Sequence, residues 1–240
     1  ALYKSEKFFD LDNDISFYEP QFSRHKMSKY WYLIKMIFYL RRSVKKINPD
    51  TILAFGEWTN PYVVLGLSGL KYPLFVSDRM GPMAKLPLIS EYIRRNYYKK
   101  TTGIIAQSNF GKEVLEKKTK ALNIHVIYNP VNCVEKVKCS IKNRIVSVGR
   151  LEEVKGHEFL IKAFAKLENK DWELSIVGDG SLMNKLKSLV ISLGIEDRVF
   201  FHGHLKDFRL QLSEAKIFVL PSLSEGFPNA LIEAMSVPLA

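Results

Sequence analysis

The chain has 240 residues, of which 47% are hydrophobic and 25% charged, a balance that allows a large buried core and excludes disordered and fibrous proteins. Its longest apolar stretches are shorter than the roughly 20 residues that a membrane-spanning helix requires, so we expect no transmembrane segment. The net charge of +11 lies mainly in residues 1–132, with 21 Lys and Arg against 11 Asp and Glu, which favours an anionic partner such as a phospholipid surface, a lipid pyrophosphate or a nucleic acid.

The start of the chain and its cysteines predict a cytoplasmic protein. Residues 1–10 show no apolar core followed by a small-residue cleavage site, the pattern of a secretory signal. Cys133 and Cys139 are too few for a disulfide framework, and no histidine pair stands near them at zinc-ligand spacing. Reduced thiols are therefore the expected state.

The first half alternates short β-branched runs with helical patterns, the signature of βαβ units on a parallel sheet. Strands are expected at 51–55, 74–77, 103–107 and 125–128, and helices at 29–46, 60–70, 89–100 and 109–118. These elements predict a Rossmann-like domain.

The helix expected at 29–46 has two different faces. One face carries aliphatic residues at core spacing: Leu33, Ile37, Leu40 and Val44. The opposite stripe mixes aromatic residues with cations: Trp31, Lys35, Phe38 and Arg42. Two interpretations stay open, because such a stripe can lie at a membrane interface, or its aromatic residues can pack against a neighbouring element as in most amphipathic helices of α/β domains.

A break at Asn129, Pro130 and Val131 is followed by a polar stretch without periodicity. We therefore expect an N-terminal domain at 1–132, a linker at 133–143 and a C-terminal domain at 144–240. The second domain repeats the first pattern, with strands at 145–148, 173–177, 199–201 and 217–220, and helices at 157–168, 181–193, 207–214 and 229–236. The sequence thus predicts an α/β fold of two successive Rossmann-like domains.

The strongest chemical signal is the segment 225–233, EGFPNALIE, directly after the last expected strand. Pro228 suits the first turn of a helix, so Glu225 is expected in the preceding loop and Glu233 within the helix. Free N–H groups at the helix start can hold phosphate oxygens, and carboxylates accept paired hydrogen bonds from vicinal hydroxyls. This combination suits a sugar nucleotide.

A second signal, VGRLEEVKG at 148–156, follows the first strand of the second domain, at the strand end where open α/β sheets bind ligands. Gly149 and Gly156 allow close approach of the backbone. Arg150 and Lys155 supply two cations for a diphosphate leaving group as its negative charge develops, in the role that a metal ion could otherwise fill. Taken alone, an arginine and a lysine in a loop are more often surface charges.

Together these motifs resemble those of the family 4 (group 1) glycosyltransferases with the GT-B fold. The second half contains, in order and at the family's spacing, GRLEEVKG, IVGDG, FHGHLKD and VLPSLSEGFPNALIEAM, and the first half adds NPDTILAFG, VSDRMGP, IIAQSNFGKE and HVIYNPVN. The resemblance covers nearly the whole chain and implies two domains facing across a cleft. Because the family's first strand with its glycine-rich loop is missing and the chain stops at 237–240 before further expected elements, we expect both domains to be incomplete.

The resemblance implies a role for each matching residue. Arg150 and Lys155 would bind the donor diphosphate, Glu225 the transferred sugar and Glu233 the ribose hydroxyls. The other matching positions would line the donor pocket: Gly149, Gly226, Phe227 and Asn229, with Gly203, His204 and Leu205 near the nucleobase. The acceptor-side candidates are Asp78 and Arg79, in a turn where many relatives carry a histidine.

The resemblance further implies a transferase that moves a hexose or N-acetylhexosamine from a nucleotide-diphosphate sugar, with UDP as the expected nucleotide. The acceptor would be a glycan or a polyprenyl-pyrophosphate-linked saccharide in polysaccharide or lipopolysaccharide assembly. Family members retain the anomeric configuration without a metal ion, so we expect neither a metal nor a further cofactor. The basic first half would hold such an enzyme peripherally on the cytoplasmic membrane face.

Three other interpretations stay open. The sequence Gly178-Asp179-Gly180 between a strand and a helix resembles a nicotinamide-binding fingerprint, but Met183 occupies the place of its third glycine, which makes a dehydrogenase a weaker hypothesis. A non-catalytic protein that binds RNA through the basic segment 94–100 is the second, but this segment matches no nucleic-acid motif, so we expect no nucleic-acid partner. The last alternative is a truncated, non-catalytic fragment that binds a sugar nucleotide or a membrane.

Overall fold

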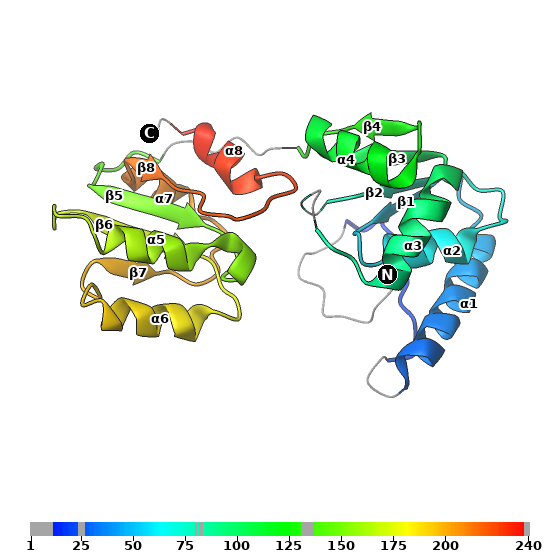
Figure 1. Cartoon of the computed structure of the whole chain (residues 1–240), viewed down its shortest axis with the longest axis horizontal. Helices are drawn as coiled ribbons and strands as arrows, with labels where there is room; N and C mark the ends of the chain where they lie inside the picture. The colour runs from blue at the N-terminus through cyan, green and yellow to red at the C-terminus, as the bar shows by residue number, and fades with distance from the viewer. Residues whose placement is uncertain (1–11, 24–26, 80, 82–83, 131–136, 238–240) are drawn as a thin grey trace. The chain divides into compact units, whose positions relative to one another are not determined.

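The computed structural model describes residues 12–23, 27–79, 81, 84–130 and 137–237. The chain divides into two compact units, Ala1–Tyr128 and Asn129–Ala240, each built on a parallel sheet (Figure 1). The predicted α/β class with two Rossmann-like domains is thereby confirmed. The cleft between the domains and the linker at 133–143 stay predictions, and Cys133 lies outside the described residues.

The first unit contains a four-stranded parallel sheet in the order β1-β2-β3-β4. Its strands are β1 (Ile52–Phe55), β2 (Leu74–Ser77), β3 (Gly103–Ala106) and β4 (Ile124–Val126). Its helices are α1 (Lys29–Ile47), α2 (Asn60–Leu67), α3 (Leu88–Tyr97), the 3-10 turn η2 (Tyr98–Lys100) and α4 (Asn109–Thr119). Each strand and helix predicted for this half is present, with its ends shifted by a few residues.

Serine caps fix where two of these helices begin. The Ser28 hydroxyl accepts a hydrogen bond from the Trp31 N–H at 3.4 Å, and the Ser108 hydroxyl accepts one from the Gly111 N–H at 3.0 Å. Helix α1 ends at Asn48, which adopts a left-handed conformation with φ of 50°. Local side-chain chemistry therefore sets these helix ends.

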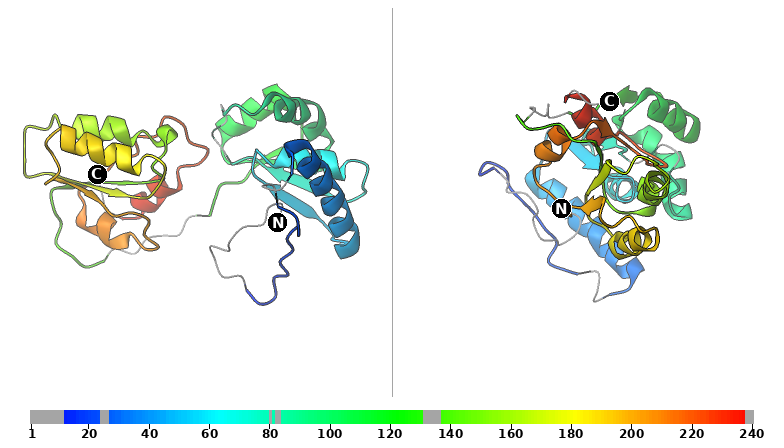
Figure 2. Two further views of the ribbon diagram at one scale, coloured as in Figure 1. Left: turned by 90° about the horizontal axis from the view of Figure 1, so that it is seen from below. Right: turned by 90° about the vertical axis from the view of Figure 1, so that its left-hand side faces the viewer.

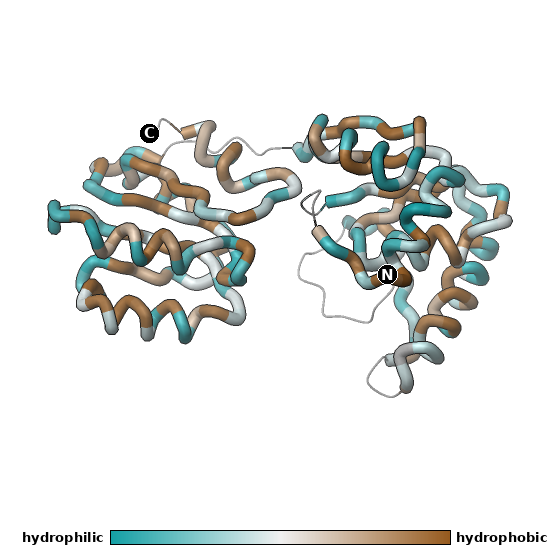
Figure 3. Tube along the Cα trace, viewed as in Figure 1, coloured by the Kyte–Doolittle hydropathy of each residue, from teal (hydrophilic) through white to brown (hydrophobic). Residues whose placement is uncertain are grey.

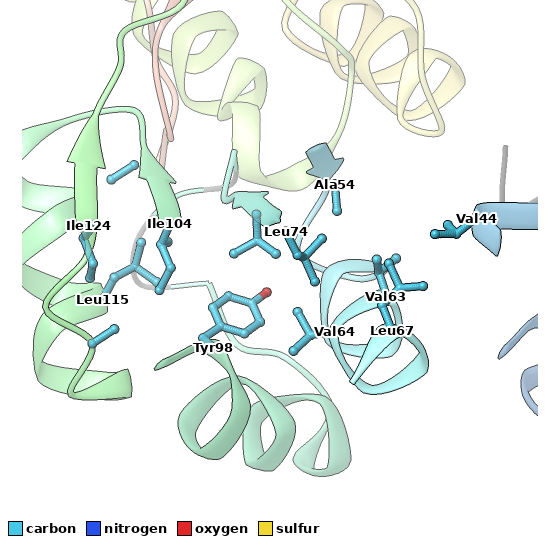
Figure 4. Packing of buried hydrophobic residues seen from close by; sticks show 13 residues of the cluster. Val44, Ala54, Val63, Val64, Leu67, Leu74, Tyr98, Ile104, Leu115 and Ile124 are labelled. Carbon is cyan, nitrogen blue, oxygen red and sulfur yellow. The ribbon is translucent and has the colours of Figure 1, made fainter. Parts of the chain in front are cut away.

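One hydrophobic core joins the sheet to helices α1, α2 and α4 in the first unit (Figure 4). Val76, Tyr98 and Ile104 at its centre are fully buried. The Tyr98 hydroxyl lies 3.4 Å from the Asp78 carboxylate, so the core reaches the loop that follows β2.

The outer face of α1, defined by Tyr30, Trp31, Ile34, Lys35, Phe38 and Arg42, is exposed. Trp31 is 62% exposed and Phe38 69%, so within the described part of this chain these rings do not pack against a neighbouring element. The helix contains no Asp or Glu, and hydrophobic and hydrophilic residues alternate along it (Figure 3).

Within the described residues, no helix combines the length and hydrophobicity that a bilayer crossing requires.

The second unit contains a parallel sheet in the order β7-β6-β5-β8. Its strands are β5 (Arg144–Val148), β6 (Glu173–Val177), β7 (Val199–Phe201) and β8 (Ile217–Phe218). Its helices are the 3-10 turn η3 (Glu153–Lys155), α5 (His157–Phe164), α6 (Met183–Ser192), α7 (Arg209–Glu214) and α8 (Asn229–Met235). Helices α5 and α6 pack on one face of the sheet, and α7 and α8 on the other (Figure 2).

The strand order reverses beside β5. The chain runs outward from β5 through β6 to β7 and then returns to β8 on the other side of β5. The loops after β5 and β8 therefore leave the sheet in opposite directions, and open α/β sheets bind their ligands at such a switch point.

Glycines bring three loops together backbone to backbone at the carboxyl edge of this sheet. The Gly149 N–H donates to the Val177 carbonyl at 2.9 Å, and the Gly178 N–H donates to the Gly203 carbonyl at 2.8 Å. Gly178 has a φ of +144°, and a Cβ atom there would lie 1.9 Å from the Gly149 carbonyl oxygen. A side chain at position 178 is therefore incompatible with this packing.

Two glycine substitutions test this packing. We expect Gly178→Ala to lower the free energy of unfolding by about 3 kcal/mol or more, because the backbone must move to admit the methyl group. Gly194→Ala is the matched control, since Gly194 also has a positive φ (+63°) but no atom within 4 Å of the added Cβ, so only about 1 kcal/mol is expected. Urea unfolding measures both, and equal losses would contradict the close approach.

Candidate functional site

The loop after β5 and the loop after β8 are bound to each other at the switch point. The Leu223 N–H donates to the Val154 carbonyl at 2.8 Å. Gly156 has a φ of +67°, and a Cβ atom there would lie 2.1 Å from the Pro221 carbonyl oxygen. The two predicted motifs, about seventy positions apart in the chain, therefore share one small surface.

Lys155 and Glu225 meet on that surface. The Lys155 ammonium lies 2.6 Å from the Glu225 carboxylate, and the two side chains are 20% and 21% exposed. A short bond between partly desolvated charges is stronger than an ordinary surface ion pair. The structure thus places a cation and a carboxylate together at the edge of the sheet, with both still reachable from solvent.

Arg150 lies in the same loop as Lys155, between Gly149 and Leu151. Its side chain is exposed, and its charge helps to lower the pKa of the neighbouring Glu152. The Glu152 carboxylate accepts hydrogen bonds from the Ser181 hydroxyl at 2.8 Å and the Ser181 N–H at 3.2 Å, and these two bonds lower the pKa of Glu152. The structure brings Lys155 to Glu225, and the expected convergence of Arg150 on the same ligand stays a prediction.

The start of α8 offers fewer free N–H groups than the sequence predicted. The Asn229 N–H donates to the Phe227 carbonyl at 3.0 Å, and the Leu231 and Ile232 N–H groups both donate to the Pro228 carbonyl. Pro228 lies just before the helix, as expected. These three backbone donors already have partners, and the phosphate site at this helix start stays a prediction.

Most residues in and just before α8 are partly accessible to solvent. Gly226 and Phe227 are half-buried, and the Asn229 amide oxygen accepts a hydrogen bond from the Asn129 amide at 2.9 Å. Glu233 is half-buried too, and burial raises the pKa of its carboxyl group. A half-buried carboxyl group of this kind can accept hydrogen bonds from hydroxyl groups.

The loop after β7 reaches the same edge of the sheet. Gly203 has a φ of +66° and accepts the Gly178 N–H described above, while Leu205 packs against the core under α7 and α8. His204 is exposed, and His202 is bound to the Ser175 hydroxyl at 3.0 Å. Three loops of one sheet therefore carry the predicted residues to a common edge.

The acceptor-side candidates lie in the first unit, at the end of β2. Asp78 is buried, accepts a hydrogen bond from the Asn60 amide at 3.3 Å and lies 3.8 Å from the Arg94 guanidinium. Burial raises the pKa of Asp78, against the lowering effect of Arg94. The guanidinium of the neighbouring Arg79 lies 5.2 Å over the Phe55 ring. The Asp78 carboxylate is thus engaged inside the protein, while Arg79 faces outward.

His157 is a site residue that the sequence did not indicate. It is 3% exposed, lies beside Gly149 and Lys155, and neither of its ring nitrogens has a hydrogen-bond partner among the described residues. Burial, aided by the Lys155 charge, lowers the pKa of His157 to about 4. Its place directly after Gly156 was the signal available, but burial cannot be read from a single sequence.

No three His, Cys, Asp or Glu side chains are close enough to share a metal ion in the part of the chain that the structure describes. The carboxyl groups of Glu225 and Glu233 are instead available for hydrogen bonding. The edge of the second sheet can therefore hold an anion at Lys155 and hydroxyl groups at Glu225 and Glu233.

Comparison with known proteins adds to this geometry. The sequence profile described as "Glycosyl transferases group 1" matches residues 135–240. An uncharacterised glycosyltransferase of Haemophilus influenzae is 30% identical in an alignment of 248 positions, which covers 98% of this chain and 67% of that protein. The Campylobacter jejuni enzyme named GalNAc-alpha-(1->4)-GalNAc-alpha-(1->3)-diNAcBac-PP-undecaprenol alpha-1,4-N-acetyl-D-galactosaminyltransferase is 26% identical in an alignment of 246 positions, which again covers 98% of this chain and 67% of the relative.

A solved structure shares the fold. The crystal structure of Anabaena Alr3699/HepE in complex with UDP and glucose is 18% identical and superposes with a TM-score of 0.73, over 87% of this chain and 62% of that one. The chain therefore spans about two thirds of the length of each of these proteins. These matches do not favour the dehydrogenase or the RNA-binding alternative.

The buried His157 makes a pH dependence testable. Because the pKa is about 4 in the folded state and 6.5 for the free side chain, the unfolded chain takes up the proton first as the pH falls. We expect His157 to remove about 3 kcal/mol of stability between pH 7 and pH 4, a loss that His157→Gln should not show. Urea unfolding across this range measures it, with His125→Gln on the exposed part of β4 as control. Parallel profiles for parent and His157→Gln would refute the assignment.

Proposed function

Since this chain belongs to the group 1 glycosyl transferases, we propose that it binds a UDP-sugar and, in the whole protein, transfers the hexose or N-acetylhexosamine to a saccharide acceptor. The observation that carries this proposal is the contact of Lys155 with Glu225 at the switch point of the second sheet. Binding of a diphosphate requires a cation, and binding of sugar hydroxyls requires a carboxylate. Here the two groups lie close enough for one small molecule to contact both.

The donor roles follow the predicted assignment. Lys155 and Arg150 bind the diphosphate, and Glu225 accepts hydrogen bonds from the transferred sugar. Glu233, half-buried in α8, accepts them from the ribose hydroxyls. The walls of the pocket are the backbone and side chains of Gly149, Gly203, His204, Leu205, Gly226, Phe227 and Asn229.

UDP is the first nucleotide to test because it occupies the Anabaena protein of the same fold. The acceptor class is supported by the Campylobacter relative, whose name specifies a saccharide on undecaprenyl diphosphate. We propose a glycan or polyprenyl-pyrophosphate-linked acceptor in polysaccharide or lipopolysaccharide assembly, with Asp78 and Arg79 of the first unit as the acceptor-side residues. Because the Asp78 carboxylate is buried, we favour the exposed Arg79 as the group that contacts the acceptor.

The transfer is proposed to retain the anomeric configuration. The acceptor oxygen bonds to the anomeric carbon on the face from which the diphosphate departs, and the departing phosphate oxygen takes the acceptor proton. Lys155 stabilises the charge that develops on this phosphate, which is the largest catalytic contribution expected of the chain. The coupling constant of the anomeric proton in the product tests retention, and an inverted product would exclude this route.

A peripheral position on the cytoplasmic membrane face fits the first unit. The outer face of α1 exposes Tyr30, Trp31 and Phe38 beside cations, and the helix contains no acidic residue. Aromatic and basic residues on one face are typical of helices that lie in the lipid headgroup region. The partner proposed for this face is an anionic phospholipid bilayer, where a lipid-linked acceptor would also reside.

Calorimetric titration of the chain with UDP-glucose, UDP-galactose and their N-acetylated forms tests donor binding. We expect Lys155→Ala and Glu225→Ala each to weaken the best of these donors about tenfold to a hundredfold, because each loses a charged hydrogen bond. Lys162→Ala, which removes an exposed lysine from α5, is the matched control and should bind like the parent. Unchanged affinity in both site variants would disprove the assignment.

Vesicle sedimentation tests the membrane surface. We expect binding to phosphatidylglycerol vesicles at low salt, little binding to phosphatidylcholine vesicles, and a loss of about tenfold in Trp31→Ala/Phe38→Ala. Phe159→Ala removes an equally exposed ring, 60% accessible, from α5 of the second unit and should have no effect. Equal losses in the two variants, or no binding of the parent to anionic vesicles, would rule out this surface.

A further inference from the structure

The loops that carry Lys155 and Glu225 hold these side chains against each other. Val154 and Leu223 are joined by a backbone hydrogen bond, and Gly156 touches the Pro221 carbonyl with no room for a side chain. Neither loop can move away without breaking these contacts. The backbones that carry the 2.6 Å ion pair are therefore held side by side, and both charged groups remain about one fifth exposed.

A diphosphate that approaches Lys155 meets the Glu225 carboxylate at the same ammonium. The ammonium has three N–H donors and can contact both anions, but the two anions then repel each other across a partly desolvated space. In the ion pairs of the described residues, Lys155 is the cation that faces Glu225. A nucleoside diphosphate alone consequently weakens the interaction that neutralises Glu225.

A nucleotide sugar compensates for this loss. Its hydroxyl groups can donate hydrogen bonds to the Glu225 carboxylate while its diphosphate takes Lys155. We propose that the Lys155–Glu225 pair makes the site select the intact nucleotide sugar over the free nucleoside diphosphate. This inference rests on the proposed function and assigns Glu225 a second task, which is to disfavour the product once the sugar has left.

The decisive variant is Glu225→Gln, which keeps the size of the side chain and removes its charge. We expect its affinity for UDP to rise about tenfold, because the diphosphate no longer competes with a carboxylate for Lys155. Its affinity for the best UDP-sugar should not rise, so the ratio of donor affinity to UDP affinity falls by about tenfold or more. Calorimetric titration of the whole chain with UDP and with that UDP-sugar measures both numbers.

Two further variants separate this effect from a general change in charge. Glu158→Gln removes the same single charge from α5, where Glu158 pairs with Lys162 and Lys185, and should leave UDP affinity unchanged. In Lys155→Ala/Glu225→Gln the gain should vanish, because the cation that the diphosphate would use is absent.

The outcomes are distinguishable. If the parent binds neither UDP nor any UDP-sugar, the proposed function itself fails. If the parent binds a UDP-sugar but Glu225→Gln binds UDP no better than the parent does, the selection role of the pair is overturned and donor binding stands. A rise of equal size in Glu158→Gln would also overturn it, since the cause would then be net charge.

Discussion

The loop after β5 and the loop after β8 touch backbone to backbone at Gly156 and Pro221, and the chemistry of the second unit depends on that contact. Only a glycine fits at position 156, where an added Cβ atom would lie 2.1 Å from the Pro221 carbonyl oxygen. With the two loops held together, the Lys155 ammonium lies 2.6 Å from the Glu225 carboxylate. A cation and an acid from distant parts of the sequence are thus positioned by the backbone.

The two units build the carboxyl edges of their sheets by different means. In the second unit the loops pack through glycines such as Gly149 and Gly178, so polar side chains are left available for a ligand. In the first unit a buried network of Asp78, Asn60 and Arg94 fixes the loop after β2. Removing one partner from such a buried pair costs about 3–5 kcal/mol, so these groups are committed to structure. This difference explains why Glu225 is accessible for binding while Asp78 is enclosed.

Much of the fold could be predicted because strands buried in parallel sheets read as β-branched runs between helical patterns. Helix ends were less predictable: the helix expected from 207 begins at Arg209, whose N–H is bound by the Asp207 side chain. The joining of Lys155 to Glu225 was foreseeable from the family pattern. The burial of His157 and the exposure of Trp31 were not, since both depend on which neighbours tertiary packing supplies.

The two units differ in their balance of charge, and this difference bears on the two proposed partners, a lipid surface and a nucleotide sugar. In the second unit, cations such as Arg144 and Lys142 are held in ion pairs with Glu173 and Glu214, near the amino ends of β5 and β6. The excess of positive charge belongs to the first half of the chain, and α1 adds cations there without a single acid. In the proposed function, an anionic surface would be attracted to the first unit over a long range, whereas a diphosphate would be bound through direct contact with Lys155. Because screening weakens long-range attraction far more than a direct contact, added salt would release the lipid surface before the nucleotide sugar.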